Sequence, residues 1–138
     1  MRRLAFPKKR RLVSNVQFKA VLDRGRRAGN SVLTLYVAGN DCGYPRLGIS
    51  VGKSSGHAVG RNRLKRLLRE AFRESQEDIP QSFDYVLMIS PSLARRLRQP
   101  QDTMTAKSLT LGQIQKAFLS LLNRVFEAPA ENDRGSDS

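Results

Sequence analysis

An unbroken run of five apolar residues, Tyr85–Ile89, restricts the possible fold more than any other feature of this sequence. The run ends at Ser90 and Pro91, and a short apolar run bounded in this way is typical of a strand buried on both faces. A chain of 138 residues has the size of one domain. We therefore expect a single-domain α+β sandwich, in which helices pack on the sheet that contains this strand.

Two more strands are predicted at Val32–Val37 and Leu47–Val51, and the second alternates strictly between apolar and other residues. Residues 39–46, between them, are rich in turn residues and predict that the two strands form a hairpin. The 38–46 region also leaves room for one extra short strand. Residues 26–30 are predicted to be a loop.

The first helix is predicted from its end signals. Ser14 and Gln17 have the spacing of a capping box, and Val13, just before the cap, can pack on Phe18 as a hydrophobic staple. Gly25 lies where a C′ glycine ends a helix. The pattern therefore predicts one helix between residues 14 and 25.

Two later helices are predicted in the same way. Ser92 is the expected cap of a short helix over residues 93–98, and Thr110 with Gln113 forms a second capping box. The apolar residues after Thr110 recur at helical spacing and line one face of a last helix. The elements expected from the residues alone follow the order α-β-β-α-β-α.

The two ends of the chain differ from this domain in composition. Residues 1–11 form a basic arm with six positive charges, within a domain that we expect to span residues 1–127. Residues 128–138 are acidic and lack apolar residues other than alanine, which predicts a disordered tail.

Positive charge is concentrated in the first half of the chain. The whole sequence carries 25 Lys and Arg against 12 Asp and Glu, a net charge of +13. Residues 1–73 hold 18 basic and 3 acidic residues, a net +15, whereas residues 74–138 hold 7 basic and 9 acidic residues, a net −2. A polyanionic partner such as nucleic acid explains this asymmetry better than a need for solubility.

The segment Arg61–Arg73 is predicted to be a helix with two opposite faces. Leu64, Leu67, Leu68, Ala71 and Phe72 form one apolar stripe at 100° per residue. The opposite side is basic and polar: Asn62, Lys65, Arg66, Arg69 and Arg73. Like charges this close destabilise a free helix, and phosphates would neutralise them. Arg61 falls within the apolar stripe, in the first turn, so we expect it to reach off the helix end beside the sheet.

Residues 53–70 resemble the signature of the bacterial ribonuclease P protein subunit. Eleven positions match at fixed spacing: Lys53, Gly56, Ala58, Val59, Arg61, Asn62, Arg63, Lys65, Arg66, Arg69 and Glu70. The strand residues Gly48–Val51 before them also match, as do Arg11, Leu12, Phe18 and Val21 near the start. The resemblance covers about residues 9–126. Ser54 and His57 depart from the family pattern, and nothing in the tail has a counterpart.

This resemblance implies a fold and an activity. The family fold is α-β-β-β-α-β-α with a left-handed β-α-β crossover, although such crossovers are right-handed in nearly all proteins. Members are protein cofactors of a ribozyme, whose RNA holds the catalytic Mg2+ ions and removes the 5′ leader from precursor tRNA. The expected partners are therefore the catalytic RNA and precursor tRNA, with no obligatory protein partner, and the expected location is the cytoplasm.

The resemblance also implies two RNA-binding surfaces and no catalytic residue in the protein. Lys53, Arg63, Lys65, Arg66 and Arg69 would bind phosphates of the catalytic RNA, with Arg61 and Asn62 beside them. A cleft between the first helix and the sheet would bind the single-stranded leader through Phe18, Tyr36, Arg61 and Asn62. Aromatic rings can stack on unpaired bases of any sequence, although Phe18 also fits ordinary core packing.

Other classes of function fit the sequence less well. A structural RNA-binding protein, such as a ribosomal protein, has the same composition and differs only at the 53–70 signature. A metal-dependent nuclease would need a cluster of carboxylates, and the basic half has only Asp23, Asp41 and Glu70, which are scattered. Cys42 and His57, the only Cys and His, cannot form a tetrahedral zinc site or a disulfide. No apolar run approaches the length of a membrane span.

Overall fold

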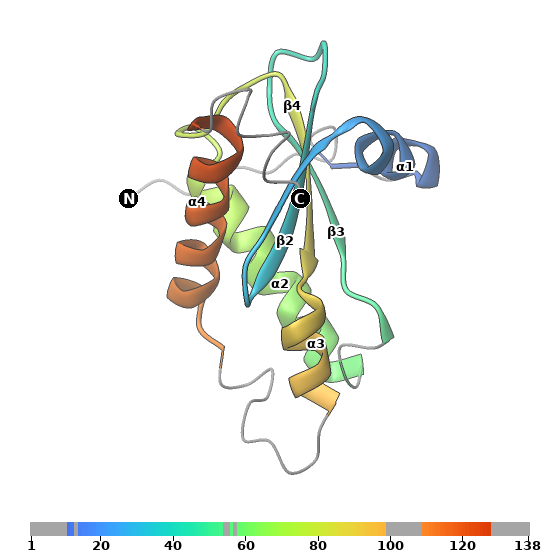
Figure 1. The fold of residues 1–138 in the computed structure, drawn as a ribbon, viewed down its shortest axis with the longest axis vertical. Helices are drawn as coiled ribbons and strands as arrows, with labels where there is room; N and C mark the ends of the chain where they lie inside the picture. The colour runs from blue at the N-terminus through green and yellow to red at the C-terminus, as the bar shows by residue number, and fades with distance from the viewer. Residues whose placement is uncertain (1–10, 13, 54–55, 57, 99–108, 128–138) are drawn as a thin grey trace.

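Helices and strands form the predicted α+β fold. The structure is a computed structural model, and it describes residues 11–12, 14–53, 56, 58–98 and 109–127. Its elements are α1 (Asn15–Arg24), β1 (Arg26–Gly29), β2 (Leu33–Gly39), β3 (Arg46–Ser50), α2 (Ala58–Ser75), β4 (Phe83–Ile89), α3 (Pro91–Arg98) and α4 (Leu111–Glu127) (Figure 1). This is the order that the family resemblance implies, with α3 as a short helix between β4 and α4.

The apolar strand β4 lies inside the sheet, whose order is β1-β2-β4-β3. It pairs antiparallel with β2 and parallel with β3, and α2 connects the two parallel strands, as a β-α-β crossover requires. Tyr85, Val86 and Leu87 are fully buried, which confirms the predicted burial on both faces. Burial raises the pKa of the Tyr85 phenol, and its hydroxyl donates a hydrogen bond to the Pro80 carbonyl at 2.7 Å.

The predicted hairpin between residues 32–37 and 47–51 is wrong, because β4 lies between β2 and β3. The turn residues at 39–46 do end β2, but the chain then crosses to the far side of β4. A strand as apolar as β4 is best buried when it has a partner on each edge. Turn residues indicate where a strand ends, but they do not determine which strand pairs with it in the sheet.

The predicted loop at residues 26–30 is also wrong, because residues 26–29 form β1. This strand pairs antiparallel with β2. The extra short strand expected in the 38–46 region does not form, because residues 40–45 form the connection between β2 and β3, and the sheet gains its additional strand at β1 instead. Asn30 closes the turn that follows, since its side-chain oxygen accepts hydrogen bonds from the backbone N–H groups of Val32 and Leu33 at 2.9 and 2.8 Å. The strand could not be recognised from the sequence, because Arg26 and Arg27 are exposed, only Ala28 is buried, and the segment therefore shows no apolar alternation.

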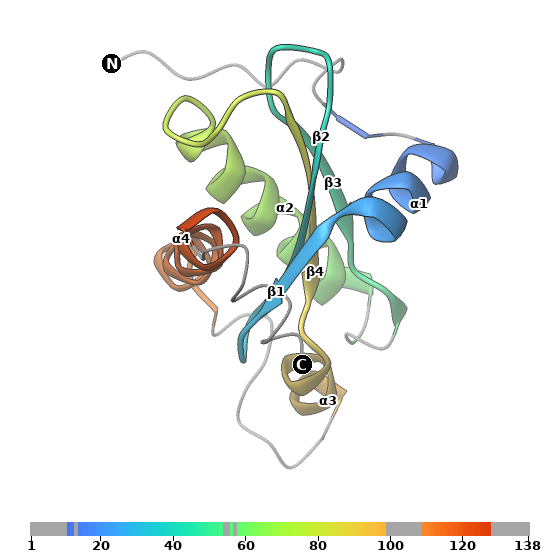
Figure 2. The same ribbon diagram turned by 45° about the horizontal axis from the view of Figure 1, so that its top comes forward.

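Two layers of helix enclose the sheet. α2 and α4 cover one face, and α1 covers part of the other (Figures 1 and 2). The larger core lies under α2 and α4 and includes Leu35, Leu87 and Phe118, whereas a smaller cluster under α1 contains Leu12, Val21, Ala38 and Val86. The sheet face beneath α1 is thus the one that remains partly open.

The apolar stripe of α2 packs as predicted. Leu64, Leu68, Ala71 and Phe72 are fully buried, and Leu67 is half-buried against the same core. The helix begins at Ala58, three residues before the predicted start, and ends at Ser75.

Both predicted capping boxes are confirmed. The Ser14 hydroxyl accepts a hydrogen bond from the Gln17 N–H at 3.1 Å, and the Gln17 side chain accepts one from the Ser14 N–H at 3.2 Å. Thr110 and Gln113 make the same two bonds at 3.2 and 2.9 Å. The staple residue Val13 lies outside the described residues.

The prediction that Ser92 caps the short helix is wrong. The Ser90 hydroxyl accepts the hydrogen bond from the Leu93 N–H at 3.1 Å and donates one to the Ser31 carbonyl at 2.8 Å. Pro91 takes the first helical position, where its missing N–H costs nothing and its fixed φ suits a helix. α3 therefore begins directly at the end of β4.

Most of the predicted basic arm and all of the predicted tail lie outside the described residues. At the end of the arm, Arg11 forms a parallel bridge with Leu47 of β3. The Leu12 N–H donates to the Leu47 carbonyl at 2.8 Å, and the Leu12 side chain is buried beneath α1. The chain therefore enters the domain along the β3 edge of the sheet.

Gly25 joins α1 to β1 at a close approach of backbone to backbone. Its φ of −79° is not the left-handed value typical of a C′ glycine. A Cβ atom at this position would lie 2.4 Å from the Val21 carbonyl oxygen and 2.9 Å from the Val37 carbonyl oxygen. The glycine is needed because it lets the end of α1 lie directly against β2.

We expect Gly25→Ala to lower the free energy of unfolding by about 1–3 kcal/mol, because two backbone carbonyls must move away from the new methyl group. Gly39→Ala is the matched control, since a Cβ there meets nothing within 4 Å. Urea denaturation of both variants measures the difference. Equal stability of the two variants would contradict the close approach at Gly25.

Candidate nucleic-acid interface

The polar side of α2 is available to a partner along most of its length. Asn62, Arg66 and Arg69 are exposed and Lys65 is half-buried, as the helical spacing predicts. We call these four residues the basic helix face. Between residues 42 and 69 the sequence has no Asp or Glu, so no carboxylate on this helix offsets the charge of the face before Glu70. Such a face is suited to the phosphate backbone of a nucleic acid.

Arg73 was predicted to extend this face, but a neighbouring carboxylate engages it. Its guanidinium forms an ion pair with Glu70, three residues earlier, and the Arg73 side chain is half-buried. The hydrogen bond that Arg73 donates to the Glu70 carboxylate raises the pKa of Arg73. The basic helix face therefore ends at Arg69.

Arg63 lies apart from the other predicted RNA-contacting residues. Its guanidinium donates a hydrogen bond to the Leu109 carbonyl at 2.9 Å and is half-buried. Leu109 is buried and stands just before α4, so this bond fixes the start of α4 to α2. The prediction that Arg63 contacts RNA therefore competes with a structural role.

Arg61 lies in the first turn of α2, as predicted, and is half-buried. Its Nε atom is buried and has no hydrogen-bond partner in the described structure. A buried N–H without a partner costs free energy that a bound acceptor would recover. Lys53, also among the predicted residues, is exposed shortly after β3, and Ser54 and His57 lie outside the described residues.

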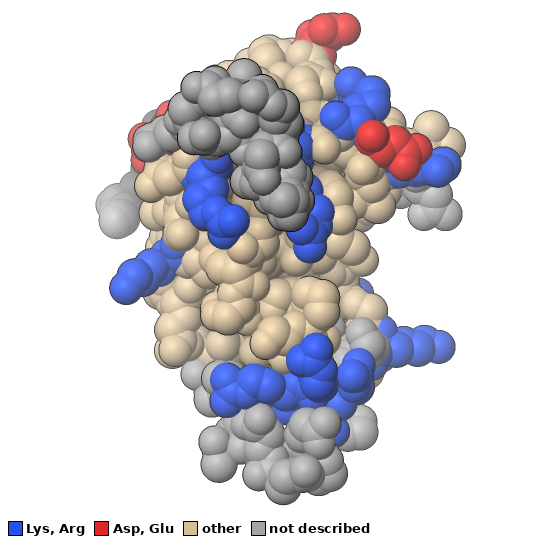
Figure 3. Space-filling view, in the orientation of Figure 1, with Lys and Arg blue, Asp and Glu red and all other residues tan. Residues whose placement is uncertain are grey.

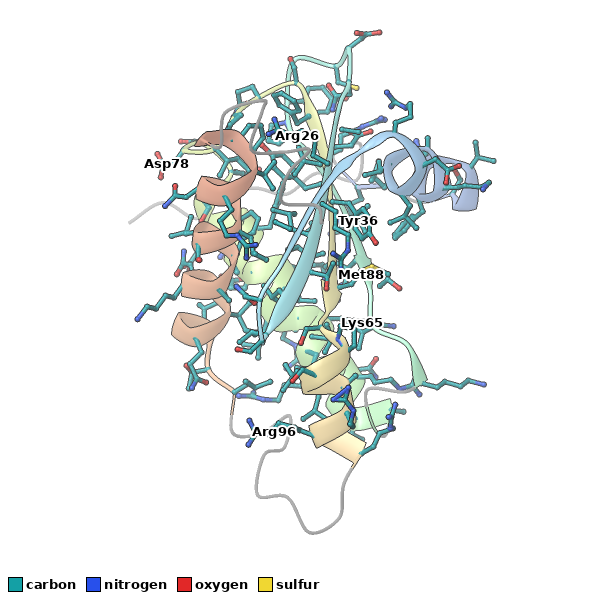
Figure 4. All side chains as sticks on the ribbon, in the orientation of Figure 1. Arg26, Tyr36, Lys65, Asp78, Met88 and Arg96 are labelled. Atoms are coloured by element: carbon teal, nitrogen blue, oxygen red, sulfur yellow. The ribbon has the colours of Figure 1, made fainter. Side chains whose placement is uncertain are left out.

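The sheet face beneath α1 carries the predicted aromatic site. Tyr36 points away from the buried Leu35 and Val37, as its alternation in the strand predicts, and is half-exposed. Met88, two residues along β4 from the Tyr36 partner Val86, is also half-exposed, and Figure 4 shows both side chains.

Three residues of this face were not predicted from the sequence: Met88 and two more that pair across the sheet. Arg27 pairs directly with Tyr36 across β1 and β2 and is exposed, and Ser50 pairs with Met88 across β3 and β4. We call Arg27, Tyr36, Met88 and Ser50 the open sheet face. Arg27 could not be assigned to the open sheet face, because its segment was predicted to be a loop. Met88 was not predicted to be accessible, because its strand was predicted to be buried on both faces.

Phe18 borders the open sheet face and also belongs to the core. Its ring is half-buried and packs against the small cluster beneath α1. A Cβ at Gly48 would lie 2.8 Å from the Phe18 Cζ atom, so the absence of a side chain there lets the ring approach β3. Both interpretations of Phe18, core packing and an edge for stacking bases, agree with this position.

The described part of the chain has neither a metal-binding cluster nor a membrane-spanning helix. No three His, Cys, Asp or Glu side chains gather there closely enough to hold a metal ion. None of its helices combines the length and the apolar character needed to cross a bilayer.

Comparison with known proteins agrees with this geometry. The family model described as ribonuclease P matches residues 6–124. The ribonuclease P protein component of Brevibacillus brevis is 36% identical over 128 residues, which cover 90% of this chain and 91% of that protein. The corresponding protein of Clostridium botulinum is 34% identical over 111 residues, which cover 80% and 96% of the two chains.

Solved structures give the same result. The RNase P protein of Thermotoga maritima superposes with a TM-score of 0.69 at 29% identity, covering 83% of this chain and 96% of that one. The RNase P protein of Staphylococcus aureus gives a TM-score of 0.65 at 32% identity, covering 85% and 97%. In fold and in sequence over most of its length, this chain belongs to the ribonuclease P protein family.

Proposed function

We propose that this chain is the protein cofactor of a ribonuclease P ribozyme. It binds the catalytic RNA and the 5′ leader of precursor tRNA, and so assists the endonucleolytic cut that forms the mature 5′ end of the tRNA. The observation that carries this proposal is the basic helix face, where exposed Arg66 and Arg69 stand beside half-buried Lys65 on a helix inside the region that matches the family model.

The two surfaces divide the work in this proposal. Arg66, Arg69 and Lys65, together with Lys53, contact phosphates of the catalytic RNA, where affinity depends on charge. The open sheet face receives the leader, where Tyr36 stacks on an unpaired base and the neighbouring Arg27 attracts the backbone. Arg61 lies in the first turn of α2 and Asn62 follows it, and the free Nε of Arg61 offers the leader or the catalytic RNA a donor.

The chemistry of cleavage belongs to the RNA in this proposal. Mg2+, held by the catalytic RNA and by no residue of this chain, would supply the activation of water and the stabilisation of the leaving oxygen. The protein contributes positive charge, which reduces the repulsion between the phosphates of the two RNAs and so lowers the Mg2+ concentration that cleavage requires. It acts in the cytoplasm, where it would meet precursor tRNA.

Tyr36→Ala is expected to weaken binding of precursor tRNA to the holoenzyme about tenfold or more, because one base–aromatic stacking contact contributes about 1–3 kcal/mol. Binding of mature tRNA, which has no leader, should not change. The dissociation constants of both tRNA forms measure the effect.

Tyr44→Ala is the control for Tyr36→Ala, because Tyr44 is a half-buried tyrosine in the connection between β2 and β3, outside the open sheet face. It should leave both dissociation constants unchanged. An equal loss for the two tRNA forms in Tyr36→Ala, or none for either, would assign Tyr36 to packing alone.

The proposed function itself is tested by the RNA that accompanies the protein. We expect that sequencing the RNA purified with the intact chain from its host will find the catalytic RNA of ribonuclease P as the dominant species. Ribosomal RNA in its place would support the alternative class, a structural ribosomal protein.

A further inference from the structure

α3 presents three arginines to solvent at one end of the molecule. Its eight residues bury Leu93 and Ala94 in the core that α2 and α4 share, and Leu97 packs partly against the same core. Arg95, Arg96 and Arg98 are all exposed, and we call them the α3 arginines. They lie outside the 53–70 signature, in the half of the chain that has no net positive charge.

The fold brings the α3 arginines next to residues of the signature. A Cβ at Gly56 would lie 3.9 Å from the Leu97 carbonyl oxygen, so the last turn of α3 lies against the segment between Lys53 and α2. Figure 3 shows the consequence: blue Lys and Arg side chains gather at the lower end of the visible face, and the red acidic side chains lie in its upper part. The chain has no Asp or Glu within residues 42–69 or 85–98.

A purely structural role explains only part of this arrangement. Cations in the last turn of a helix interact favourably with its dipole, and each contributes about 0.3–1 kcal/mol. The dipole does not explain why the α3 arginines lie at the same end of the molecule as Lys53 and the first turn of α2. Phosphates of a polyanion bound across this end would interact with all of these exposed cations.

We propose that the α3 arginines and Lys53 form a second phosphate-binding surface for the catalytic RNA, continuous with the start of the basic helix face. This inference rests on the proposed function. The catalytic RNA is favoured over the leader by the position of α3. Its apolar residues belong to the core on the α2 side of the sheet, whereas the open sheet face lies on the α1 side.

The test replaces Arg95, Arg96 and Arg98 together with alanine, which favours the helix and leaves its buried side unchanged. Binding of the full-length protein to the catalytic RNA is measured over a series of salt concentrations. Three lost phosphate contacts should lower the slope of log K against log salt by about 2–3 units. A control variant with Lys19, Arg24 and Lys116 replaced by alanine removes three cations from α1 and α4 and should keep the wild-type slope.

A wild-type slope in the α3 variant overturns the inference, and so does an equal fall in slope in the control variant. A loss confined to precursor tRNA binding by the holoenzyme also overturns it, because the arginines would then contact the substrate. If the triple variant does not fold, the single Arg95→Ala variant should lower the slope by about one unit. The double variant Arg66→Ala/Arg69→Ala distinguishes failure of this inference from failure of the proposed function. If the double variant has a reduced slope and the α3 variant keeps the wild-type slope, the proposed function stands and the second surface does not.

Discussion

Asp84→Ala is expected to lower the free energy of unfolding by about 3 kcal/mol, because it removes the buried carboxylate that pairs with the half-buried Arg46 guanidinium. Asp84 is 4% exposed. Its two carboxylate oxygens accept hydrogen bonds from Arg46 Nε and Nη2 at 2.7 and 2.8 Å, and one of them accepts a third from the Asn40 amide at 2.7 Å. The Asp84 hydrogen bond also raises the pKa of Arg46. Urea denaturation measures the loss.

Asp23→Ala is the matched control, because it breaks an ion pair of the same type on the surface. Asp23 lies 3.1 Å from Lys19 in α1, and the two side chains are 59% and 76% exposed. An exposed pair contributes about 0.2–1 kcal/mol. Similar losses in the two variants would show that burial adds nothing to the Arg46–Asp84 pair and would contradict its role in joining β3 to β4.

Arg66→Ala/Arg69→Ala is expected to weaken binding to the catalytic RNA without changing the fold. Both side chains are exposed, so the buried stripe of α2 is untouched and the free energy of unfolding should remain within about 0.5 kcal/mol of the wild type. Two lost phosphate contacts should lower the slope of log K against log salt by about 1 to 2 units. Binding measured at several salt concentrations gives this slope.

Lys19→Ala/Lys116→Ala removes the same charge from α1 and α4 and is the control for that double variant. It should bind the catalytic RNA with the wild-type slope. If Arg66→Ala/Arg69→Ala also keeps the wild-type slope, the basic helix face is merely solvated, and the RNA contacts must lie elsewhere on the protein.

Local features of the sequence predicted the elements that depend on neighbouring residues. Ser14 and Thr110 cap their helices as expected, because a capping box involves only four consecutive residues. The stripe and the basic side of α2 also follow from helical spacing. The burial of β4 on both faces follows from its composition. Tyr36 was placed correctly because strand alternation decides which face a residue points to.

Features that depend on distant residues could not be predicted in this way. β4 lies between β2 and β3, and this strand order depends on the packing of the whole sheet. Arg63 donates a hydrogen bond to the carbonyl of Leu109, 46 residues away, and a helical wheel cannot predict a contact with a distant segment. β1 was missed because an edge strand with exposed arginines has no apolar alternation. The α3 arginines lie next to residues of the 53–70 segment only because the chain, after β4, returns to the end of the molecule where that segment lies.

Cleavage of precursor tRNA over a series of Mg2+ concentrations tests the proposed function most directly. Three samples are compared: the catalytic RNA alone, the rigorously RNA-free protein alone, and the two together. We predict that the protein alone cleaves nothing and that, added to the RNA, it lowers the Mg2+ concentration needed for half-maximal cleavage. Cleavage by the RNA-free protein, or an unchanged Mg2+ requirement when both are present, would contradict the role of a cofactor to a catalytic RNA.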